Sequence, residues 1–502
     1  MPTSNPTDKP RRHDDREAIY DLCIVGMGVA GLNALFVAKQ YLKEDAKIAV
    51  IDRHDGCGGM WNTVYDYVRL HQPYELFTVG NIKWTLKRPP DYLATGKEVL
   101  DHFQYCFDRI KSNASIDEYW GTEVTSISEA AADDPEHACL AIRPLSENAQ
   151  ERVLRCRQVI DARALNVPVK QALALSSDAV TSIAPQHFSS KVSASDNRPI
   201  YIVGGGKTGM DTAFLAVSQN PNRKVVLVAG RGTAFSNRDI MFPTGMQKYL
   251  SLKSNFRATL DVVMRFDGTN APEVSDYFRQ MYAVSPGNKS ENFFFGLLSE
   301  HENALIRDRV ADIIFEYLED VVDADTGPAI KFRTGELVKI EEGAVVVNCT
   351  GYLTRRESPK KAILSGSGRV LSISPRAAFH PLPGISAYFS THLMFKNLLS
   401  DNKFYVVDNE VLSTTADTAV WHMAVLCQIL YNMIYALDVL PMKVFQDFGL
   451  DFERWQPVHK RLLSFGTLIA NKDKYKDHCG KALERVSVAH AVACHPFKHD
   501  TP

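Results

Sequence analysis

Two glycine-rich turns of the same design lie far apart in the chain, each between an apolar strand and the start of a helix. They occur in CIVGMGVAGLNALF, residues 23–36, and in YIVGGGKTGMD, residues 201–211. Both have the spacing Gly-x-Gly-x-x-Gly. The first glycine permits a tight turn, the second lets the backbone approach a pyrophosphate, and the third lets helix and strand pack closely. The helix N-terminus then offers unpaired N–H groups to phosphates. We therefore expect an α/β fold with two Rossmann-like dinucleotide-binding domains.

The first turn is followed by further features of a dinucleotide site. Its glycines are Gly26, Gly28 and Gly31, and the next apolar strand, KIAVID, ends in Asp52. An acid at this position accepts hydrogen bonds from ribose hydroxyls. Just beyond it, GCGGMWN supplies Gly59 for a second close approach of the backbone and Trp61 as an aromatic wall. These residues predict a tightly held dinucleotide at the first turn.

The second turn differs from the first at the end of its second strand. Its glycines are Gly204, Gly206 and Gly209, and the strand KVVLV leads into Ala229-Gly230-Arg231 with no acid. An acid would repel a 2'-phosphate, whereas a guanidinium binds it through charge-assisted hydrogen bonds. We therefore predict NADPH in preference to NADH, with Arg231 as the 2'-phosphate ligand. The turn residues Lys207 and Thr208 are candidates for the phosphate side.

On these motifs the chain resembles the class B flavin-dependent monooxygenases, which include N- and S-oxygenating and Baeyer–Villiger enzymes. That family shares the first glycine motif, the acid on the second strand and a G-G-x-W segment. The resemblance implies FAD at the first turn and NADPH at the second, with the NADP domain inserted in the FAD domain. It also implies that the backbone of Val124 meets the adenine. Thr350 and Gly351 in NCTG would lie where the chain returns from the insert.

The expected domain layout follows from the resemblance and from local patterns. We expect a disordered lead-in over 1–17, an FAD-binding domain over 18–195 and 336–470, an NADPH-binding domain over 196–335, and a C-terminal extension over 471–502. Alternation within 139–145 and 152–161 predicts a small antiparallel meander. Apolar residues at helical spacing predict a helix over 290–321.

The segment after Trp61 departs from the family pattern. In YDYVRLHQP, His71 stands where N- and S-oxygenating members have an asparagine that contacts flavin, nicotinamide and oxygen. A histidine donates one hydrogen bond and can move a proton near neutral pH. We take His71 as the candidate catalytic residue and Gln72 as the alternative amide. A purely structural histidine beside a proline turn is the competing interpretation. A second family signature, F-x-G-x-x-x-H, survives only as His187.

The resemblance implies an enzyme in which NADPH reduces FAD and a peroxyflavin inserts one oxygen atom of O2 into nitrogen, sulfur or a carbonyl of a small organic substrate. Because of His71 and the incomplete second signature, an NADPH-dependent flavin oxidase or reductase that yields peroxide or reduces a quinone-like acceptor is the alternative. A non-catalytic flavin-bound redox sensor is a third hypothesis.

Charge, cysteine content and hydropathy argue against several other classes of protein. A formal net charge of -2 argues against general nucleic-acid binding. Nine cysteines without a C-x-x-C pair fit a reducing compartment and argue against a dithiol-disulfide reductase. The apolar run 419–440 contains several polar residues, so we expect a core helix and no membrane association. The sequence has no metal-ligand spacing, so we expect no bound metal. We also expect a cytoplasmic enzyme. A homodimer is the candidate assembly.

Overall fold

The computed structural model describes residues 19–130, 134–163, 168–251, 255–351, 361–399, 403–449, 451, 453–492 and 494–496. The lead-in expected over 1–17 lies outside these ranges.

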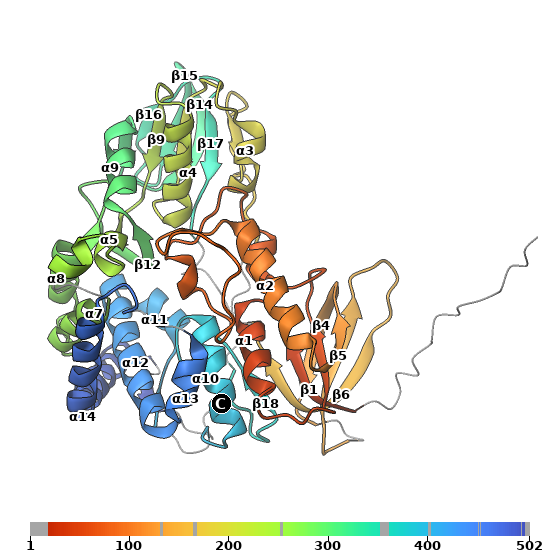
Figure 1. Cartoon of the computed structure of the whole chain (residues 1–502). Coiled ribbons are helices and arrows are strands. Elements are labelled where there is room, and N and C mark those ends of the chain that lie inside the picture. The colour runs from red at the N-terminus through yellow and green to blue at the C-terminus, as the bar shows by residue number, and fades with distance from the viewer. Residues whose placement is uncertain are drawn as a thin grey trace, which may run out of the picture.

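The first sheet contains the first glycine turn (Figure 1). Its strand order is β3 (Ser115–Tyr119), β2 (Lys47–Ile51), β1 (Ile19–Val25), β6 (Arg152–Asp161), β5 (Ala138–Pro144) and β4 (Thr122–Ser128). The strands β1, β2, β3 and β6 are parallel, and β18 (Val370–Ser372) pairs in parallel with the end of β6. The pair β5–β6 is antiparallel, which confirms the predicted meander, and β4 pairs antiparallel with β5 as a further strand. Helix α1 (Val29–Ala38) packs between α2 (Gly96–Lys111) and α10 (Pro383–Phe395).

The second sheet contains the second glycine turn. It consists of five parallel strands in the order β13 (Asp312–Ile314), β9 (Val225–Val228), β8 (Ile200–Val203), β17 (Val345–Asn348) and β7 (Thr181–Ile183). On one face α4 (Lys207–Gln219) packs against α9 (Glu300–Arg309). The other face shares an apolar core with the antiparallel strands β14 (Leu318–Ala324), β15 (Gly327–Phe332) and β16 (Leu337–Lys339).

The second sheet is inserted in the first, as the expected fold class requires. The chain leaves the first sheet after β6 and re-enters it at β18, and all five strands of the second sheet lie between these two points. The insert takes in more of the chain than the expected range 196–335, because β7 and β17 pair with strands of the second sheet. Because the strands that β7 and β17 pair with are distant in sequence, no local pattern predicts this pairing.

The helix predicted over 290–321 is wrong. This stretch forms β12 (Asn292–Leu298), α9, β13 and the start of β14. Ser299 begins α9 with a capping box, because its hydroxyl accepts from the Glu302 N–H and the Glu302 carboxylate accepts from the Ser299 N–H. Before and after that helix the apolar residues pair in sheets, β12 with β10 (Thr233–Asn237) and β13 with β9. Only Ile306 of the apolar positions used for that prediction lies in a helix.

A third, helical body lies at the lower left of Figure 1. Helices α7 (Asn255–Arg265), α8 (Ala271–Tyr282), α12 (Thr418–Val439) and α14 (Val458–His490) share one apolar core. The strand β20 (Cys494–Pro496) pairs with β19 (Tyr405–Val407). The described residues of the expected C-terminal extension therefore belong to this body, and α14 crosses the expected boundary at residue 470. By length and composition α12 could cross a membrane, yet 61% of its apolar window is buried inside the protein.

Short elements complete the described chain. They are η1 (Gly59–Asn62), η2 (Tyr74–Leu76), η3 (Pro185–His187), α3 (Phe188–Lys191), α5 (Arg238–Met241), α6 (Gln247–Leu250), β11 (Ala283–Val284), α11 (Asn409–Thr415) and α13 (Met442–Phe448).

Candidate functional site

The first glycine turn has a backbone that requires glycine. Gly26 has a φ of +91°, and a β-carbon on Gly31 would overlap the carbonyl oxygen of Gly26. Helix α1 begins at Gly28, whose lack of a side chain leaves the first helical turn without a side-chain cap. The backbone N–H groups at this helix start are therefore available to a ligand, where the helix dipole favours a negative charge.

The carboxylate of Asp52 is buried beside the first turn. One of its oxygens accepts from the Met27 N–H at 2.6 Å, and the other accepts from the His54 N–H at 2.9 Å. Asp52 therefore holds the turn in place from the end of β2. The oxygen bonded to the His54 N–H also lies 3.0 Å from the His54 Nδ1, whereas the oxygen bonded to Met27 can accept a second hydrogen bond. Binding of a ribose hydroxyl stays a prediction.

The segment 58–61 folds back onto the first turn. The Gly58 N–H donates to the Met27 carbonyl at 3.0 Å, and a β-carbon on Gly59 would lie 3.0 Å from the Gly28 Cα. The backbones at Gly28 and Gly59 can pack this closely because neither residue has a side chain. Trp61 follows in η1, with its ring edge-on to Phe77 at 5.6 Å between centroids. The structure thus brings Gly28 and Gly59 together, and the role of these residues and of Trp61 in binding FAD stays a prediction.

An arginine that sequence analysis missed as a site residue lies on the other side of the first turn. Arg163 holds Asp161 through two hydrogen bonds, at 2.8 and 2.9 Å, and donates to the Val124 carbonyl at 3.0 Å. The Ala162 backbone between them packs against Gly26. Burial raises the pKa of Asp161, but Arg163 and Lys361 outweigh it and the net pKa is lowered. The sequence signal for this charged cluster is the acid–arginine spacing of Asp161-Ala162-Arg163 at the end of β6.

The second glycine turn repeats the geometry of the first. Gly204 has a φ of +125°, and a β-carbon on Gly209 would overlap the Gly204 carbonyl oxygen. Helix α4 begins at Gly206 without a side-chain cap. No described atom lies within 4 Å of the position that a β-carbon on Gly206 would take. The start of α4 therefore faces open space, as a phosphate site requires.

Thr350 and Gly351 follow β17 and lie beside the second turn. A β-carbon on Gly204 would overlap the Cys349 carbonyl, which shows how closely this segment packs there. The Thr350 hydroxyl donates to the Asn348 side chain at 2.7 Å and accepts from Lys170 at 3.3 Å. These residues thus occupy the same position relative to the second turn that Ala162 occupies relative to the first.

The two basic candidates of the second turn are placed differently. Arg231 is exposed beyond β9 and donates to the Asn292 side chain at 3.2 Å. Its role as 2'-phosphate ligand stays a prediction. Lys207, at the start of α4, forms an ion pair with Asp211 one helical turn later. Asp211 also accepts from the Tyr65 hydroxyl at 2.8 Å. Thr208 lies between them and is partly buried.

The segment 65–71 connects the first sheet with the second glycine turn. Besides the bond from Tyr65 to Asp211, the Tyr67 and Thr212 hydroxyls lie 2.8 Å apart. The His71 ring accepts at Nδ1 from the Leu297 N–H at 3.2 Å. His71 and its neighbour Gln72 are both partly buried. His71, from the first part of the chain, therefore lies against β12 of the insert.

Burial and the neighbouring charges both keep the His71 ring neutral. Burial lowers the pKa of His71 to about 3, and the positive charges of Lys207 and Arg238 act in the same direction. Arg238 donates to the His71 carbonyl at 3.3 Å and forms an ion pair with Glu302, with both side chains largely buried. Since Nδ1 accepts a hydrogen bond, the proton of the neutral ring is on Nε2. The neutral ring can therefore donate one hydrogen bond through Nε2, and the catalytic role of His71 stays a prediction.

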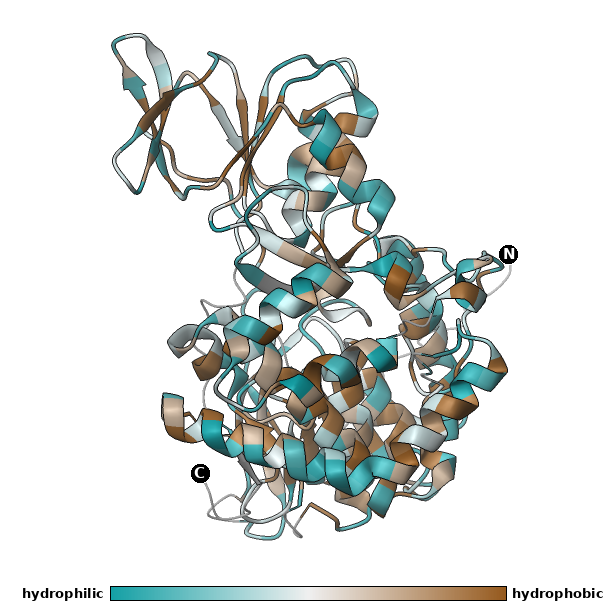
Figure 2. Ribbon diagram, turned by 90° about the vertical axis from the view of Figure 1, so that its left-hand side faces the viewer, coloured by the Kyte–Doolittle hydropathy of each residue, from teal (hydrophilic) through white to brown (hydrophobic). Residues whose placement is uncertain are grey.

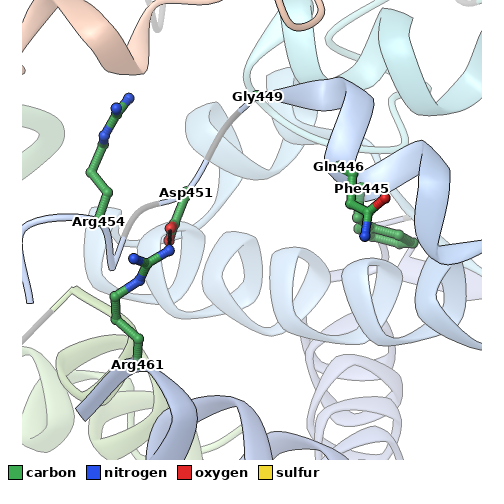
Figure 3. Close-up of a pocket in the computed structure, with 6 residues that line it drawn as sticks. All are labelled: Phe445, Gln446, Gly449, Asp451, Arg454 and Arg461. Carbon is green, nitrogen blue, oxygen red and sulfur yellow. Dashed lines mark hydrogen bonds and ion pairs between the residues drawn. The ribbon is translucent and has the colours of Figure 1, made fainter. Parts of the chain in front are cut away.

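Other parts of the described structure add no second site of this kind. Among the described residues, no group of three His, Cys, Asp or Glu side chains could hold a metal ion. All nine cysteines are buried free thiols. A cavity of about 600 Å³ lies between α13 and α14, and none of its lining residues belongs to either glycine turn (Figure 3). Its two arginines are paired, Arg461 with Asp451 and Arg454 with Glu75.

Curated relatives match this chain over a short stretch only. No family model matches the chain. An uncharacterized protein of Mycobacterium tuberculosis and one of Mycobacterium bovis are each 30% identical over 80 residues, which is 16% of this chain and 14% of the relative's length.

Solved structures match over far more of the chain, at low identity. Cyclohexanone monooxygenase from Rhodococcus sp. Phi1, bound to NADP+, is 13% identical with a TM-score of 0.47, over 91% of this chain and 98% of that one. Ornithine hydroxylase from Pseudomonas aeruginosa is 13% identical with a TM-score of 0.46, over 76% and 100%. Bacillithiol disulfide reductase from Bacillus cereus is 11% identical with a TM-score of 0.43, over 76% and 99%. Class B flavin-dependent monooxygenases are thus among the solved structures that this chain resembles.

Proposed function

We propose that this chain is an FAD- and NADPH-dependent oxidoreductase that acts as a monooxygenase on a small organic substrate. The observation that carries the proposal is the position of the segment 65–71. It leaves the loop packed on the first glycine turn and reaches α4 directly behind the second, with His71 beside Lys207 and β12. One short segment therefore lies where two bound dinucleotides would approach each other.

The described residues fit a dinucleotide at each turn. Both α1 and α4 begin at a glycine without a side-chain cap, and the space next to Gly206 is open. FAD would be held by Gly26, Gly28, Gly31, Asp52 and Gly59, and NADPH by Gly204, Gly206, Gly209 and Arg231. When bound, FAD supplies hydride acceptance and oxygen activation, which no side chain can perform.

The chain's own residues would bind and orient these groups. The two helix N-termini stabilise the negative charge of the pyrophosphates. The neutral His71 keeps one N–H on Nε2, fixed in direction because Nδ1 is occupied by the Leu297 N–H. A fixed, partly buried donor stabilises negative charge that develops nearby. His71 is therefore the candidate group for stabilising the oxygen species from which the substrate takes its oxygen atom.

The oxidase or reductase alternative is favoured by one observation. With its pKa lowered to about 3, His71 is not protonated at neutral pH and cannot act as an acid. Its single free N–H can donate a hydrogen bond, whereas an amide side chain can both donate and accept.

The monooxygenase and oxidase hypotheses differ in the fate of oxygen. We would measure NADPH consumed, hydrogen peroxide formed and oxygenated product with amines, thioethers and ketones. Product equal to the NADPH consumed supports the monooxygenase, whereas peroxide in that ratio with every substrate supports the oxidase.

Replacing His71 tests its role as a donor. In a His71→Phe variant, we expect flavin reduction by NADPH to persist and product formation to fall about 100-fold, the typical loss for one such donor. A Gln72→Leu variant tests the alternative candidate, and it should keep the wild-type product yield if His71 is the donor. Because His71 is neutral well above its pKa of about 3, the difference should not change between pH 6 and pH 9. Wild-type yield in the His71 variant would assign the ring a structural role.

Replacing Arg231 tests the choice of nicotinamide cofactor. An Arg231→Ala variant should raise the KM for NADPH about 10- to 100-fold, since hydrogen bonds to charged groups contribute roughly 1.5 to 3 kcal/mol. The KM for NADH, which has no 2'-phosphate, should stay unchanged. Arg143→Ala, at an exposed ion pair with Glu123 on the first sheet, is the control. Equal effects on both cofactors would contradict the assignment.

A further inference from the structure

Large apolar side chains are exposed along the first half of α14 and on α6. Four of the five on α14 occupy one helix face at positions i, i+4, i+7 and i+11, namely Val458, Leu462, Phe465 and Ile469, and Leu463 lies off that face. On α6 and the residue before it they are Met246, Tyr249 and Leu250. Val458 and Leu462 are each 66% exposed, and Leu250 is 76% exposed. The four residues on that α14 face and the three at α6 are called the α6–α14 patch below.

The two helices of the patch are joined. The Lys460 ammonium group donates to the carbonyl oxygens of Lys248 and Tyr249, both at 3.0 Å, and of Ser251 at 2.6 Å. Lys460 thus caps the C-terminal end of α6 and keeps it next to the start of α14. Figure 2 is turned so that the side of the molecule carrying α14 faces the viewer. Contiguous exposed apolar surface of this kind marks a site of interaction.

An apolar recess lies beside the patch. It has a volume of about 450 Å³ and is lined by Phe256, Asp451, Glu453, Val458, Arg461, Leu462, Ser464, Phe465 and Leu468. Asp451 and Arg461 form an ion pair, and both residues line this recess as well as the larger cavity in Figure 3. The recess therefore offers room for flexible apolar chains directly between the exposed side chains of α14.

The surroundings of the patch carry an excess of positive charge. The described residues within 246–257 and 451–476 contain eight lysines and arginines against three acids, a difference of five. Two acids from other elements reduce this difference to three: Asp438 of α12 pairs with Lys472 and Lys476, and Glu75 of η2 pairs with Arg454. The whole chain has a net charge of -2. The positive charge is therefore concentrated around the apolar patch.

We propose that the α6–α14 patch docks onto the surface of a lipid bilayer that contains anionic lipids. Apolar side chains on one helix face enter the boundary between headgroups and acyl chains, and the surrounding lysines and arginines attract the anionic headgroups. A second copy of this chain fits less well, because a two-fold contact would place this positive surface against itself. The docking surface lies on α6 and α14 and does not involve α12, so it is distinct from a membrane-spanning helix. It differs from our sequence-based expectation, which considered only the apolar run 419–440.

Vesicle co-sedimentation of the purified full chain tests this proposal. At low salt, we expect the protein to sediment with vesicles of phosphatidylcholine and phosphatidylglycerol, and at least tenfold less with phosphatidylcholine alone. Raising the salt concentration should weaken binding because it screens the charges. A Leu462→Glu, Phe465→Glu double variant should lower the bound fraction at least tenfold. Both side chains are exposed, so the fold should persist, which thermal unfolding would verify.

A matched control separates the patch from exposed apolar residues in general. Leu337→Glu and Val153→Glu introduce the same charge at exposed apolar positions on β16 and β6 and should sediment like the wild type. No sedimentation of the wild type with anionic vesicles at low salt would overturn the proposal. So would an equal loss in the control variants. If the wild type ignores vesicles but forms a dimer that Leu462→Glu dissociates, the patch is an interface between two copies and the proposal is wrong.

Discussion

A Gly206→Asp variant is expected to fold normally and retain FAD but to lose reduction by NADPH. No described atom lies within 4 Å of the new β-carbon, and the Gly206 φ of -83° suits any residue. Aspartate is also a preferred residue at a helix N-cap, so stability should stay equal or rise by up to about 1 kcal/mol. The carboxylate would, however, occupy the N–H groups at the start of α4 and repel a phosphate there.

We expect the concentration of NADPH that half-saturates flavin reduction to rise at least 100-fold, equivalent to about 2.7 kcal/mol. Flavin content and thermal unfolding, measured on the same preparation, show whether the first turn and the fold are intact. Gly366→Asp is the matched control, since Gly366 is an exposed glycine with open space around it. Reduction of the Gly206 variant at wild-type NADPH concentrations would mean that the second turn does not bind the cofactor.

An Arg238→Met variant should lose about 3 to 5 kcal/mol of stability, as measured by urea unfolding at neutral pH. Arg238 and Glu302 form an ion pair whose side chains are only 12% and 15% exposed. Burial raises the pKa of Glu302, but the charges of Lys207 and Arg238 lower it overall, so the carboxylate is ionised. Removing one partner of a buried pair leaves the other charge uncompensated, which is costly.

A double variant with Glu302→Gln should recover most of that loss. The glutamine oxygen still accepts from the Ser299 N–H and preserves the cap of α9, but it has no charge.

Arg238 also contributes to the low pKa of His71, which lies below the ordinary histidine value of 6.5. A histidine of this kind destabilises the fold as pH falls below 6.5. Burial is the main cause of this low pKa and persists without Arg238, so wild type and Arg238→Met should lose nearly equal stability from pH 7 to pH 5. An unchanged urea midpoint in Arg238→Met at neutral pH would show that the pair is not important for stability.

The two glycine turns could be predicted because their constraints are local. Gly31 packs on Gly26 and Gly209 on Gly204, each within five residues, so the spacing itself records the geometry. The antiparallel pair of β5 and β6 was predictable for the same reason, since alternation marks each strand and a short turn joins them.

Features that depend on distant partners could not be predicted. Apolar residues at helical spacing in 290–321 fit a helix, yet pairing with β10 and β9 makes two parts of this stretch strands. The environment of His71 depends on Arg238, which is 167 residues away, and on Glu302. The ion pair of Lys207 and Asp211, in contrast, could have been predicted from the sequence, because residues four apart on a helix are neighbours. This pair gives Lys207 a structural role, in addition to the phosphate-binding role that we proposed.

The central claim is that one chain holds a flavin and brings NADPH to it. The most direct test is to mix the purified, FAD-loaded protein with NADPH in the absence of oxygen and follow the yellow absorbance of the flavin. We predict that the colour is lost rapidly with NADPH, more slowly with NADH, and returns when oxygen is admitted. A protein that stays colourless after incubation with FAD, or a bound flavin that NADPH does not bleach, would contradict the account.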